Sequence, residues 1–470
     1  MIRKQIIMLA VPAVFEMMIH TFVTVVIIGI IGRLGAYAIT TVGINGQIII
    51  NAAFILSTIG VGASVLVARA IGKNDAAEGN FYFSKGLGMG IFLALIWGFS
   101  FRFAVPGIVN LITMDDTLRI ILTEYMSIIA VPSGALLLLF ILEFMVRGAG
   151  HTIVTLLVAV FSSTTNVVLS YILINGKFGL PALGLYGAAY GASIAYFVAL
   201  SVMLIIIGTK KLKVRIVWPE VFRPDFNAYR RILNTGLPAA VDEGLWAVNQ
   251  WVLLGILPSL GAVQYASHQI AASTEAISFM PGNGFAIATQ ILVGQKLGAG
   301  LPEEAKQATK ESLKIALPIM LAFSAVFLLF NTRLVSIFTD KQELIPIAAL
   351  CLGIAAFEQP FIAVYMVLAG AFRGAGDTKW PLRLSIITYW VIRVPLVWLV
   401  IKVLHYDITA FWYVTVLQWA IAALLCWLRF RSDKWLKVEV CKKIGVRVQG
   451  SGVRENERNT GDTRVRERLV

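Results

Sequence analysis

Four carboxylic acids inside long apolar stretches are the side chains of this sequence best suited to chemistry. They are Asp242, Glu243, Glu275 and Glu358, the last of them two residues before Pro360. An ionisable group in a membrane-spanning helix is costly to bury, so it is a functional candidate by default. A buried carboxyl group can accept a proton, and several carboxyl oxygens together can hold Na⁺. These acids predict a site for a proton or a sodium ion, with no other metal and no cofactor.

Further polar residues in the apolar stretches have a structural alternative, which is pairing with an opposite charge. Glu16 and His20 lie one helical turn apart on a predicted helix face, and Arg393 falls near the middle of a later apolar segment. Each is a secondary candidate for a functional role. Glu143 lies one turn before Arg147, and that spacing favours a local ion pair over a functional site.

An enzyme of the usual hydrolytic classes is not indicated by these residues. The chain has four histidines and contains neither HExxH nor GxSxG. Its three cysteines form no CxxC and no even-numbered set, so a disulfide framework is not expected either. Nucleic-acid binding is also not predicted, because the basic residues behind the net charge of +14 lie in short loops and a tail.

The composition requires that these side chains be positioned by membrane helices. Of 470 residues, 58% are hydrophobic and 14% charged, whereas a soluble protein has about a quarter of its residues charged. Backbone groups in hydrocarbon must bond within their own segment, so apolar segments of this length are helices. We find twelve such segments, near 6–32, 42–68, 87–111, 124–146, 153–176, 187–208, 236–257, 266–292, 312–332, 343–370, 382–403 and 407–429.

The chain is written twice, with a constant offset in residue number between the two copies. "VRGAGHT" at 146–152 is followed by "FRGAGDT" at 372–378, and the segment from Pro12 to Gly35 matches the segment from Pro238 to Gly261. This register persists through four helices, which indicates an internal duplication. Each copy has six spans, so both insert in the same direction and should be related by a pseudo-twofold axis along the membrane normal. The same offset makes Glu16 and Asp242 equivalent.

Lysine and arginine predict the orientation of the chain. The N-terminus and the even-numbered connections carry 20 of these residues, against 7 on the other side. Basic residues accumulate in cytoplasmic loops, so both termini are predicted to be cytoplasmic in a multi-pass protein of the cell (inner) membrane. The predicted parts are an N-terminal six-helix lobe, a cytoplasmic linker, a C-terminal six-helix lobe and a basic cytoplasmic tail expected to be disordered, at 1–208, 209–235, 236–430 and 431–470.

Several stretches resemble the multidrug and toxic compound extrusion (MATE) family. They are "VRGAGHT", "FRGAGDTKWPL", "LINGKFGLPALGLYGAAYG" at 173–191 and the long segment 266–306. The resemblance covers residues 5–430 and implies a monomeric secondary antiporter that exports organic cations and other amphipathic small molecules against H⁺ or Na⁺. Its two six-helix lobes would open alternately to the two sides of the bilayer.

The resemblance also bears on the cation site. Many members of the family carry an acid in the first helix, and Ile27 occupies that position here. The other family arrangement places acids in helices 7, 8 and 10 of the C-terminal lobe, where this chain has Asp242, Glu243, Glu275 and Glu358. Asn166 matches a polar helix 5 position. We therefore expect coupling in the C-terminal lobe, centred on Glu275 and Glu358.

The substrate cavity is expected to be aromatic, rich in methionine and sparsely charged, because polyspecific binding needs adaptable apolar contacts. The residues predicted to contribute are Met17, Met18, Trp246, Met280 and Tyr365. The alternative function within transport is flipping of a lipid-linked oligosaccharide by the same lobe architecture. Flippases of that kind line the cavity with several arginines, and only Arg393 is placed for this role.

Overall fold

The computed structural model describes residues 2–209 and 211–438, and within them all regular structure is helical. In the first half the elements are α1 (Ile2–Ile31), η1 (Gly32–Leu34), α2 (Ala36–Asn45), the π-helical η2 (Gly46–Ile50), α3 (Asn51–Ser57), α4 (Gly60–Gly72), α5 (Ala76–Ile112), α6 (Asp116–Ala130), α7 (Pro132–Gly148), α8 (Thr152–Asn175) and α9 (Leu185–Gly208).

The second half begins with the short helix α10 (Trp218–Phe222), which lies in the linker. It is followed by α11 (Phe226–Ile256), η3 (Leu257–Leu260), α12 (Ala262–Gly298), α13 (Pro302–Ser336), α14 (Ile345–Ala355), α15 (Gln359–Gly374), α16 (Lys379–Ser385), the π-helical η4 (Ile386–Arg393), α17 (Val394–Trp398), the π-helical η5 (Leu399–Val403), α18 (Ile408–Arg431) and η6 (Lys434–Lys437).

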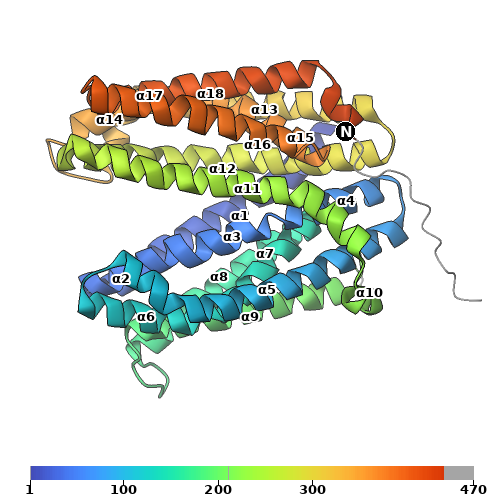
Figure 1. Ribbon diagram of the computed structural model, residues 1–470, viewed down its shortest axis with the longest axis horizontal. Helices are drawn as coiled ribbons and strands as arrows, with labels where there is room; N and C mark the ends of the chain where they lie inside the picture. The colour runs from blue at the N-terminus through green and yellow to red at the C-terminus, as the bar shows by residue number, and fades with distance from the viewer. Residues whose placement is uncertain (1, 210, 439–470) are drawn as a thin grey trace, which may run out of the picture. The chain divides into compact units, whose positions relative to one another are not determined.

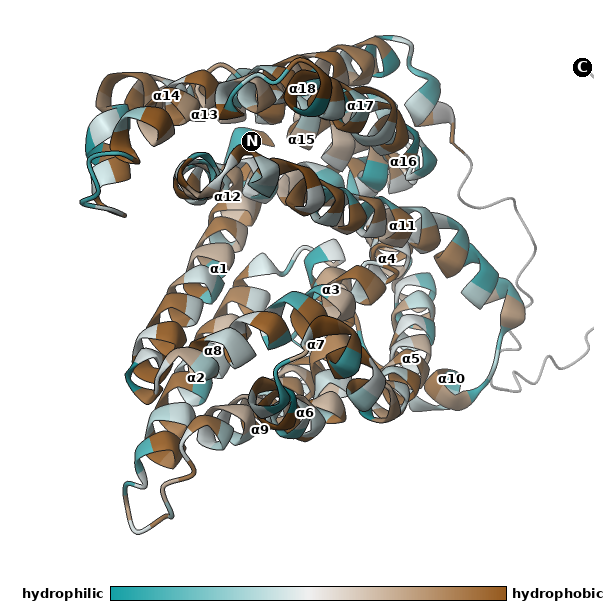
Figure 2. Cartoon of the chain, turned by 60° about the vertical axis from the view of Figure 1, so that its left-hand side comes forward, coloured by the Kyte–Doolittle hydropathy of each residue, from teal (hydrophilic) through white to brown (hydrophobic). Residues whose placement is uncertain are grey.

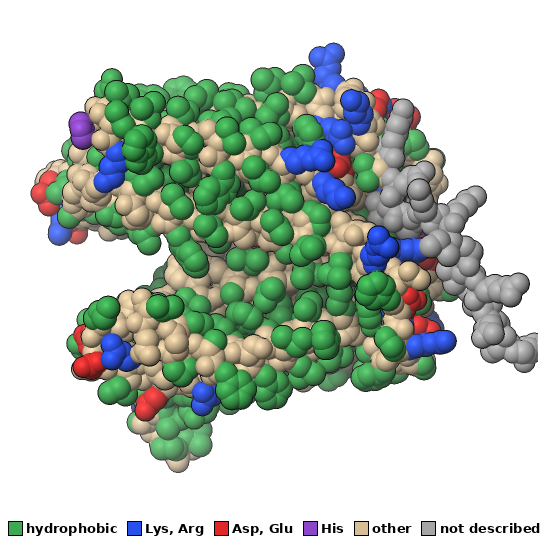
Figure 3. Space-filling view, in the orientation of Figure 1, with side chains coloured by type: hydrophobic (Ala, Val, Ile, Leu, Met, Phe, Trp, Pro, Cys, Tyr) green, Lys and Arg blue, Asp and Glu red, His purple; other side chains and the backbone are tan. Residues whose placement is uncertain are grey.

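These elements make twelve membrane spans, as predicted. In the described part of the chain, nine helices are long and apolar enough to cross a bilayer, and two bent pairs, α6 with α7 and α14 with α15, each make one more. The twelfth span is α11, whose mean hydropathy is lowered by polar residues, among them Asp242, Glu243 and Asn249. Figure 3 shows the resulting surface, with charged side chains at both ends of the helices and a hydrophobic band between them.

Two of the predicted spans are broken rather than continuous. The fourth bends by 50° between α6 and α7, and the tenth bends by 50° between α14 and α15. Pro132 is the first residue of α7, and Pro360 is the second of α15. Proline lacks the N–H that an unbroken helix needs and is well tolerated in a first turn, so each break falls directly before it.

Helix α11 begins earlier than predicted. Residues 226–235 belong to it, although their polarity assigns them to the linker. Figure 2 shows hydrophilic residues at this end of α11, mixed with apolar ones. A polar helix end outside the hydrocarbon gives no apolar signal, so hydropathy alone places the boundary too late.

The first residues of the predicted tail are ordered. Trp435 in η6 is fully buried and packs against Phe372 and Phe430, with ring centroids 5.9 and 5.5 Å away. This contact extends the C-terminal lobe beyond α18. The prediction of disorder further along falls, from residue 439 on, outside the described residues.

The duplication predicted from the sequence is present in the structure as two lobes (Figure 1). The first span of each half ends in a short 3₁₀ turn followed by a glycine with positive φ, Gly35 at 105° and Gly261 at 98°. The bent fourth spans end at Gly148 and Gly374, which are again equivalent positions of the repeat. The positive φ of Gly35 and Gly261 strains any residue with a Cβ atom, so glycine is required at the ends of both first spans.

The lobes meet along a seam of backbone-to-backbone contacts. A Cβ atom on Gly72 would lie 1.9 Å from the Gln295 carbonyl oxygen, and one on Gly298 would lie 2.1 Å from the Arg69 carbonyl oxygen. Because Arg69 and Gln295 are also equivalent positions of the repeat, exchanging the two lobes turns one of these contacts into the other. The seam joins the ends of α4 and α12, as expected near a pseudo-twofold axis.

The seam continues a short way along the helices, where Gly236 of α11 lies against the Ile59 backbone and Gly284 of α12 lies against Ala10 and Val14 of α1. Beyond these contacts the lobes separate. At the other end of the molecule Figure 3 shows a hollow, which lies between the α2 end of one lobe and the α12 end of the other (Figure 1). The structure is therefore closed at the end of α4 and open at the opposite end.

The glycine seam generates a first prediction. Gly72→Ala places a methyl group on the Gln295 backbone, and we expect a loss of about 1–3 kcal/mol from overpacking, measured as a lower Tm of the purified protein. The matched control is Gly43→Ala in α2, where nothing lies within 4 Å. Alanine favours a helix over glycine, so the control should be neutral or stabilising. Equal Tm values for the two variants would show that the seam does not need glycine.

Candidate functional site

Two of the predicted acids come together inside the C-terminal lobe. Glu275 lies in the middle of α12 and Glu358 at the break between α14 and α15, and both side chains are buried. Each is within electrostatic range of the other and of Arg393. The amide of Gln359 donates a hydrogen bond to Glu275 Oε1 at 3.3 Å. Two carboxyl groups this close favour the binding of a shared proton or a cation.

Several buried polar atoms around this pair have no hydrogen-bond partner. They include Glu358 Oε2, Gln359 Oε1 and both amide atoms of Gln418, which lies one turn beyond Thr415 of α18, a hydrogen-bond partner of Glu358. Buried polar groups are nearly always hydrogen-bonded, so such atoms mark a place that is built for a ligand or ordered water. Three of these four atoms are oxygens, which are acceptors and suit a proton donor or a hard cation.

Arg393 supplies the positive charge of this region. It is the last residue of the π-helical stretch η4, and its guanidinium carbon lies 5.2 Å from the centre of the Phe411 ring. π-Helical turns are rare and occur frequently at functional sites. Across the described residues, no group of three or more His, Cys, Asp or Glu is arranged to hold a metal ion.

The other two predicted acids are placed elsewhere. Asp242 accepts a hydrogen bond from Arg373 at 3.1 Å and another from the hydroxyl of Ser385, while Glu243 lies 3.8 Å from Arg373. The sequence predicts one site formed by Asp242, Glu243, Glu275 and Glu358. In the structure they form two separate groups, and one of them is an ion pair that ties α11 to α15.

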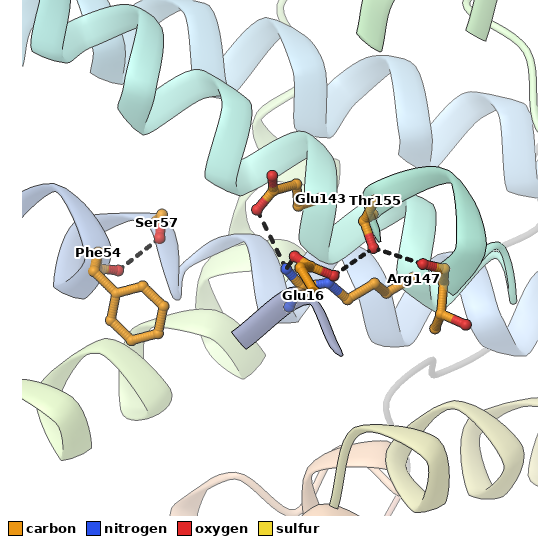
Figure 4. A network of polar contacts seen from close by, with 7 residues as sticks. Glu16, Phe54, Ser57, Glu143, Arg147 and Thr155 are labelled. Carbon is orange, nitrogen blue, oxygen red and sulfur yellow. Dashed lines mark hydrogen bonds and ion pairs between the residues drawn. The ribbon is translucent and has the colours of Figure 1, made fainter. Parts of the chain in front are cut away.

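The N-terminal lobe contains the equivalent ion pair (Figure 4). Arg147 donates to Glu16 at 2.6 Å and to Glu143 at 3.2 Å, and the hydroxyl of Thr155 donates to the other oxygen of Glu16 at 2.7 Å. The predicted local pair of Glu143 and Arg147 is present, and Glu16 is its third member. His20, one turn further along α1, is exposed.

Arg147 and Arg373 explain why the sequence RGAG occurs twice, at 147–150 and 373–376. Glu16 and Asp242 are equivalent, and so are Arg147 and Arg373, so the same bond joins the first and fourth spans of each lobe. The second acid differs between the copies, because Glu143 comes from the fourth span and Glu243 from the first. The repeat was visible in the sequence, but the bond between distant helices was not.

The predicted cavity residues do not share one location. Val14 of α1 and Gly284 of α12 touch each other at the seam. Met18 lies four residues after Val14, and Met280 lies four residues before Gly284. Because the two helices run in opposite directions, both methionines are one turn further toward the hollow. Met17 is half-buried beside Met18.

The two aromatic members of the set differ. Trp246 on α11 is 45% exposed, one turn beyond Asp242. Tyr365 is part of the packing of the C-terminal lobe, edge-on to Trp419 with ring centroids 5.2 Å apart.

Two positions of the N-terminal lobe complete the comparison with the sequence. Asn166 accepts a hydrogen bond from Ser170 at 3.1 Å, one turn along the same helix, α8. Ile27 packs against the apolar core of the lobe, which includes Val105, Leu122 and Met126. The position at which the resemblance implies an acid in many family members is therefore packed against a hydrophobic core here.

The fold and the buried polar sites define a multi-pass membrane transporter built of two parallel repeats. A solved outward-facing multidrug resistance MATE family transporter of the MOP superfamily matches with a TM-score of 0.84 at 22% identity, covering 93% of this chain and 97% of that one. A structure of MATE in the bent conformation matches with a TM-score of 0.86 at 20% identity, covering 92% and 95%.

The chain belongs to the MatE family. The family model matches residues 12–172 and again 238–399, two blocks whose starts differ by the repeat offset. A protein of Thermotoga maritima described as probable multidrug resistance protein NorM is 27% identical over 96% of both chains. The uncharacterized transporter YisQ of Bacillus subtilis is 22% identical over 85% of this chain and 88% of its own.

The intralobe ion pairs generate a second prediction. Arg147→Gln leaves Glu16 and Glu143 buried without a positive partner, and we expect a loss of about 3–5 kcal/mol of stability, measured as thermal unfolding in detergent. Adding Glu16→Gln and Glu143→Gln to Arg147→Gln should recover much of that loss. The control is Arg102→Gln, an exposed arginine of α5, with little effect. A triple variant as unstable as the single one would contradict this account.

Proposed function

We propose that this protein extrudes small amphipathic molecules, organic cations among them, in exchange for H⁺ or Na⁺. Family membership supports transport, and the relatives described as multidrug resistance proteins support drug-like substrates. The observation that carries the coupling is that Glu275 and Glu358 meet inside the lobe, both buried, beside acceptor oxygens that have no hydrogen-bond partner. A transporter driven by an ion gradient needs a cation site of this kind.

Coupling is assigned to the C-terminal lobe because the N-terminal lobe lacks the equivalent groups. The positions equivalent to Glu275 and Glu358 in the first copy of the repeat are Ile49 and Pro132, and the first-helix acid position is Ile27. Arg393 lies close enough to respond when the carboxyl pair gains or loses a cation. Such a change in local charge is the differential interaction that shifts a two-state equilibrium.

Alternating access is the mechanism that the arrangement of the lobes supports. The glycine seam closes one end, and the hollow opens at the other. With the termini cytoplasmic, as the charge distribution predicts, the open end faces the outside. Glycine contacts, such as Gly72 against Gln295, bring the backbones of the two lobes close together at this end, and this seam is what alternating access would have to open.

The hollow suits amphipathic substrates better than a lipid-linked oligosaccharide. Met18 and Met280 contribute flexible, polarisable side chains next to the seam. Arg393, the arginine placed for a sugar-phosphate role, packs on Phe411 beside the acids within its lobe. The flippase alternative is therefore not favoured.

The carboxyl pair generates a third prediction. Glu275→Gln and Glu358→Gln should each abolish gradient-driven efflux of an organic cation from proteoliposomes, because neither variant retains a pair of carboxyl groups. Imposing a proton gradient and a sodium gradient separately identifies the driving ion. Folded yield should stay near that of the wild type, since glutamine keeps the shape of the side chain.

The controls for that prediction come from other acids. Glu343→Gln removes an exposed carboxyl group and should leave efflux unchanged. Glu143→Gln should reduce efflux much less than the central substitutions, because Arg147 keeps Glu16 as its partner. If both central variants pump normally while Glu16→Gln is inactive, coupling lies in the N-terminal lobe and this assignment is wrong.

The hollow generates a fourth prediction. Met18→Ala and Met280→Ala should each weaken the binding of a fluorescent organic cation by a few-fold, on the order of 1 kcal/mol, through lost apolar contact. The ion dependence of efflux should remain that of the wild type. Met8→Ala, on the exposed surface of the same helix α1, is the control. Unchanged affinity in both seam-side variants would place the substrate elsewhere.

A further inference from the structure

The linker between the lobes is fixed to the N-terminal lobe by one buried lysine. The side chain of Lys85 on α5 is fully buried, and its ammonium donates to the carbonyl oxygens of Glu220 at 2.8 Å and Arg223 at 2.6 Å. It also pairs with the Glu220 carboxylate at 2.7 Å. Gly88, on the same face of α5, lets the backbone of α10 approach, since a Cβ atom there would lie 2.3 Å from the Val221 carbonyl oxygen.

The stretch before α10 is extended and two-sided. Leu212 and Val214 are buried, whereas Lys211, Lys213 and Arg215 between and beside them are exposed. Its backbone N–H groups bond to the N-terminal lobe, with Lys213 donating to His151 Nε2 at 3.1 Å, Arg215 to Asn80 at 2.7 Å and Val217 to Ser84 at 2.9 Å. The segment is thus held in place with its basic side chains pointing away from the protein.

His151 keeps its acceptor nitrogen free of a proton. Partial burial and the nearby charge of Lys213 lower the pKa of His151, which lies outside the membrane spans. The neutral ring can accept the hydrogen bond from the Lys213 N–H, whereas the charged ring cannot. The attachment of the linker is therefore intact at neutral pH.

Aromatic side chains extend the exposed surface of the linker from its basic residues onto α10. Trp218 and Phe222 of α10 are exposed and stack with ring centroids 6.5 Å apart, and Phe226 at the start of α11 is also exposed. On α5 the covered face ends at Gly88, and one turn further along Phe92 is 64% exposed. This is where the lipid-facing surface of α5 begins, so α10 lies at the edge of the hydrophobic band.

The acids of this segment do not offset its outward charge. Glu220 is paired with Lys85, and Asp225 caps α11 by accepting from the Ala228 N–H at 3.0 Å. Five basic side chains of the segment are exposed, namely Lys211, Lys213, Arg215, Arg223 and Arg230. Among the described residues, none of these five side chains has a hydrogen bond or an ion pair described for it. A basic and aromatic surface at the membrane boundary complements anionic lipid headgroups, with the rings at headgroup level.

We propose that residues 211–230 form a lipid-binding surface that holds the N-terminal lobe to the leaflet beside it through anionic phospholipid headgroups. The bases contact the headgroup charge, and Trp218 and Phe222 enter the interface. Lys85 and the backbone contacts of the linker keep this surface attached to the lobe. This proposal concerns the membrane environment and does not depend on the transported substrate.

The test uses the full-length protein in phosphatidylcholine bilayers that contain brominated lipid, which quenches nearby tryptophan fluorescence. At equal mole fraction, brominated phosphatidylglycerol should quench more than brominated phosphatidylcholine, and molar salt should remove most of that excess. Trp218→Phe should lose most of the excess, because it removes the reporter at the surface. Trp398→Phe, an exposed tryptophan on α17, should keep it.

The charge dependence is tested by a matched pair of double variants. Lys213→Gln with Arg215→Gln should weaken the preference for phosphatidylglycerol on the order of tenfold, since each basic residue near an anionic surface adds to the attraction. Lys341→Gln with Lys402→Gln, two exposed lysines outside the linker, should leave the preference at Trp218 unchanged.

Three outcomes would overturn the proposal. The excess quenching could survive Trp218→Phe, the linker double variant could behave as the wild type, or the control double variant could lose the preference equally. A surface built for an acidic soluble protein instead would give equal quenching by the two lipids. Melting curves of every variant confirm that the fold is retained, and no transport assay is needed.

Discussion

A buried charge in a membrane protein must have its partner inside the protein, and this constraint fixes how each lobe is assembled. Arg147 and Arg373 end the fourth spans, and Glu16 and Asp242 on the first spans are their partners. Separating either pair would leave charges in a medium of low dielectric constant, so the first and fourth spans move together. Between the lobes the contacts are of other kinds: glycine packs against backbone, as at Gly72 and Gly298, and Ile6 of α1 packs in an apolar cluster with Phe285 of α12. Rigid-body motion of the lobes would keep the buried ion pairs within each lobe and would have to open the seam, including the hydrogen bond from Arg69 to the Ala375 carbonyl oxygen.

The duplication set up two equivalent lobes, and later substitutions gave them different chemistry. The C-terminal lobe carries Glu275 and Glu358, where the N-terminal lobe has Ile49 in its core and Pro132 at its bend. The proline and the acid occupy the same structural position, a break in the fourth span of the lobe. At such a break the backbone is not fully bonded to itself, which leaves room for a polar side chain in an otherwise apolar layer.

Much of the fold is predictable from the sequence, because hydropathy marks spans and a fixed offset marks a repeat. The partners of buried groups are less accessible. The spacing of Glu143 and Arg147 predicts a local pair, but nothing in the sequence brings Glu16 to the same arginine. In a soluble helix the polar face reveals which side is buried. In a membrane both lipid and core are apolar, so the face that packs against a neighbour carries little signal. For the same reason the sequence does not distinguish Asp242, which is paired with Arg373, from Glu275.

The attachment of the linker through Lys85 makes the two lobes mechanically unequal, although their folds are copies. The chain that leads into the C-terminal lobe is clamped to the N-terminal lobe as far as Arg223, and α11 begins at Phe226. Only Pro224 and Asp225 lie between the clamp and the helix. The first turns of α11 also contact the N-terminal lobe, because Arg231 donates to the Tyr82 hydroxyl at 2.7 Å and Gly236 packs against Ile59 at the seam. The start of the C-terminal lobe is therefore held by the N-terminal lobe, so the two copies of the repeat differ in how they are anchored.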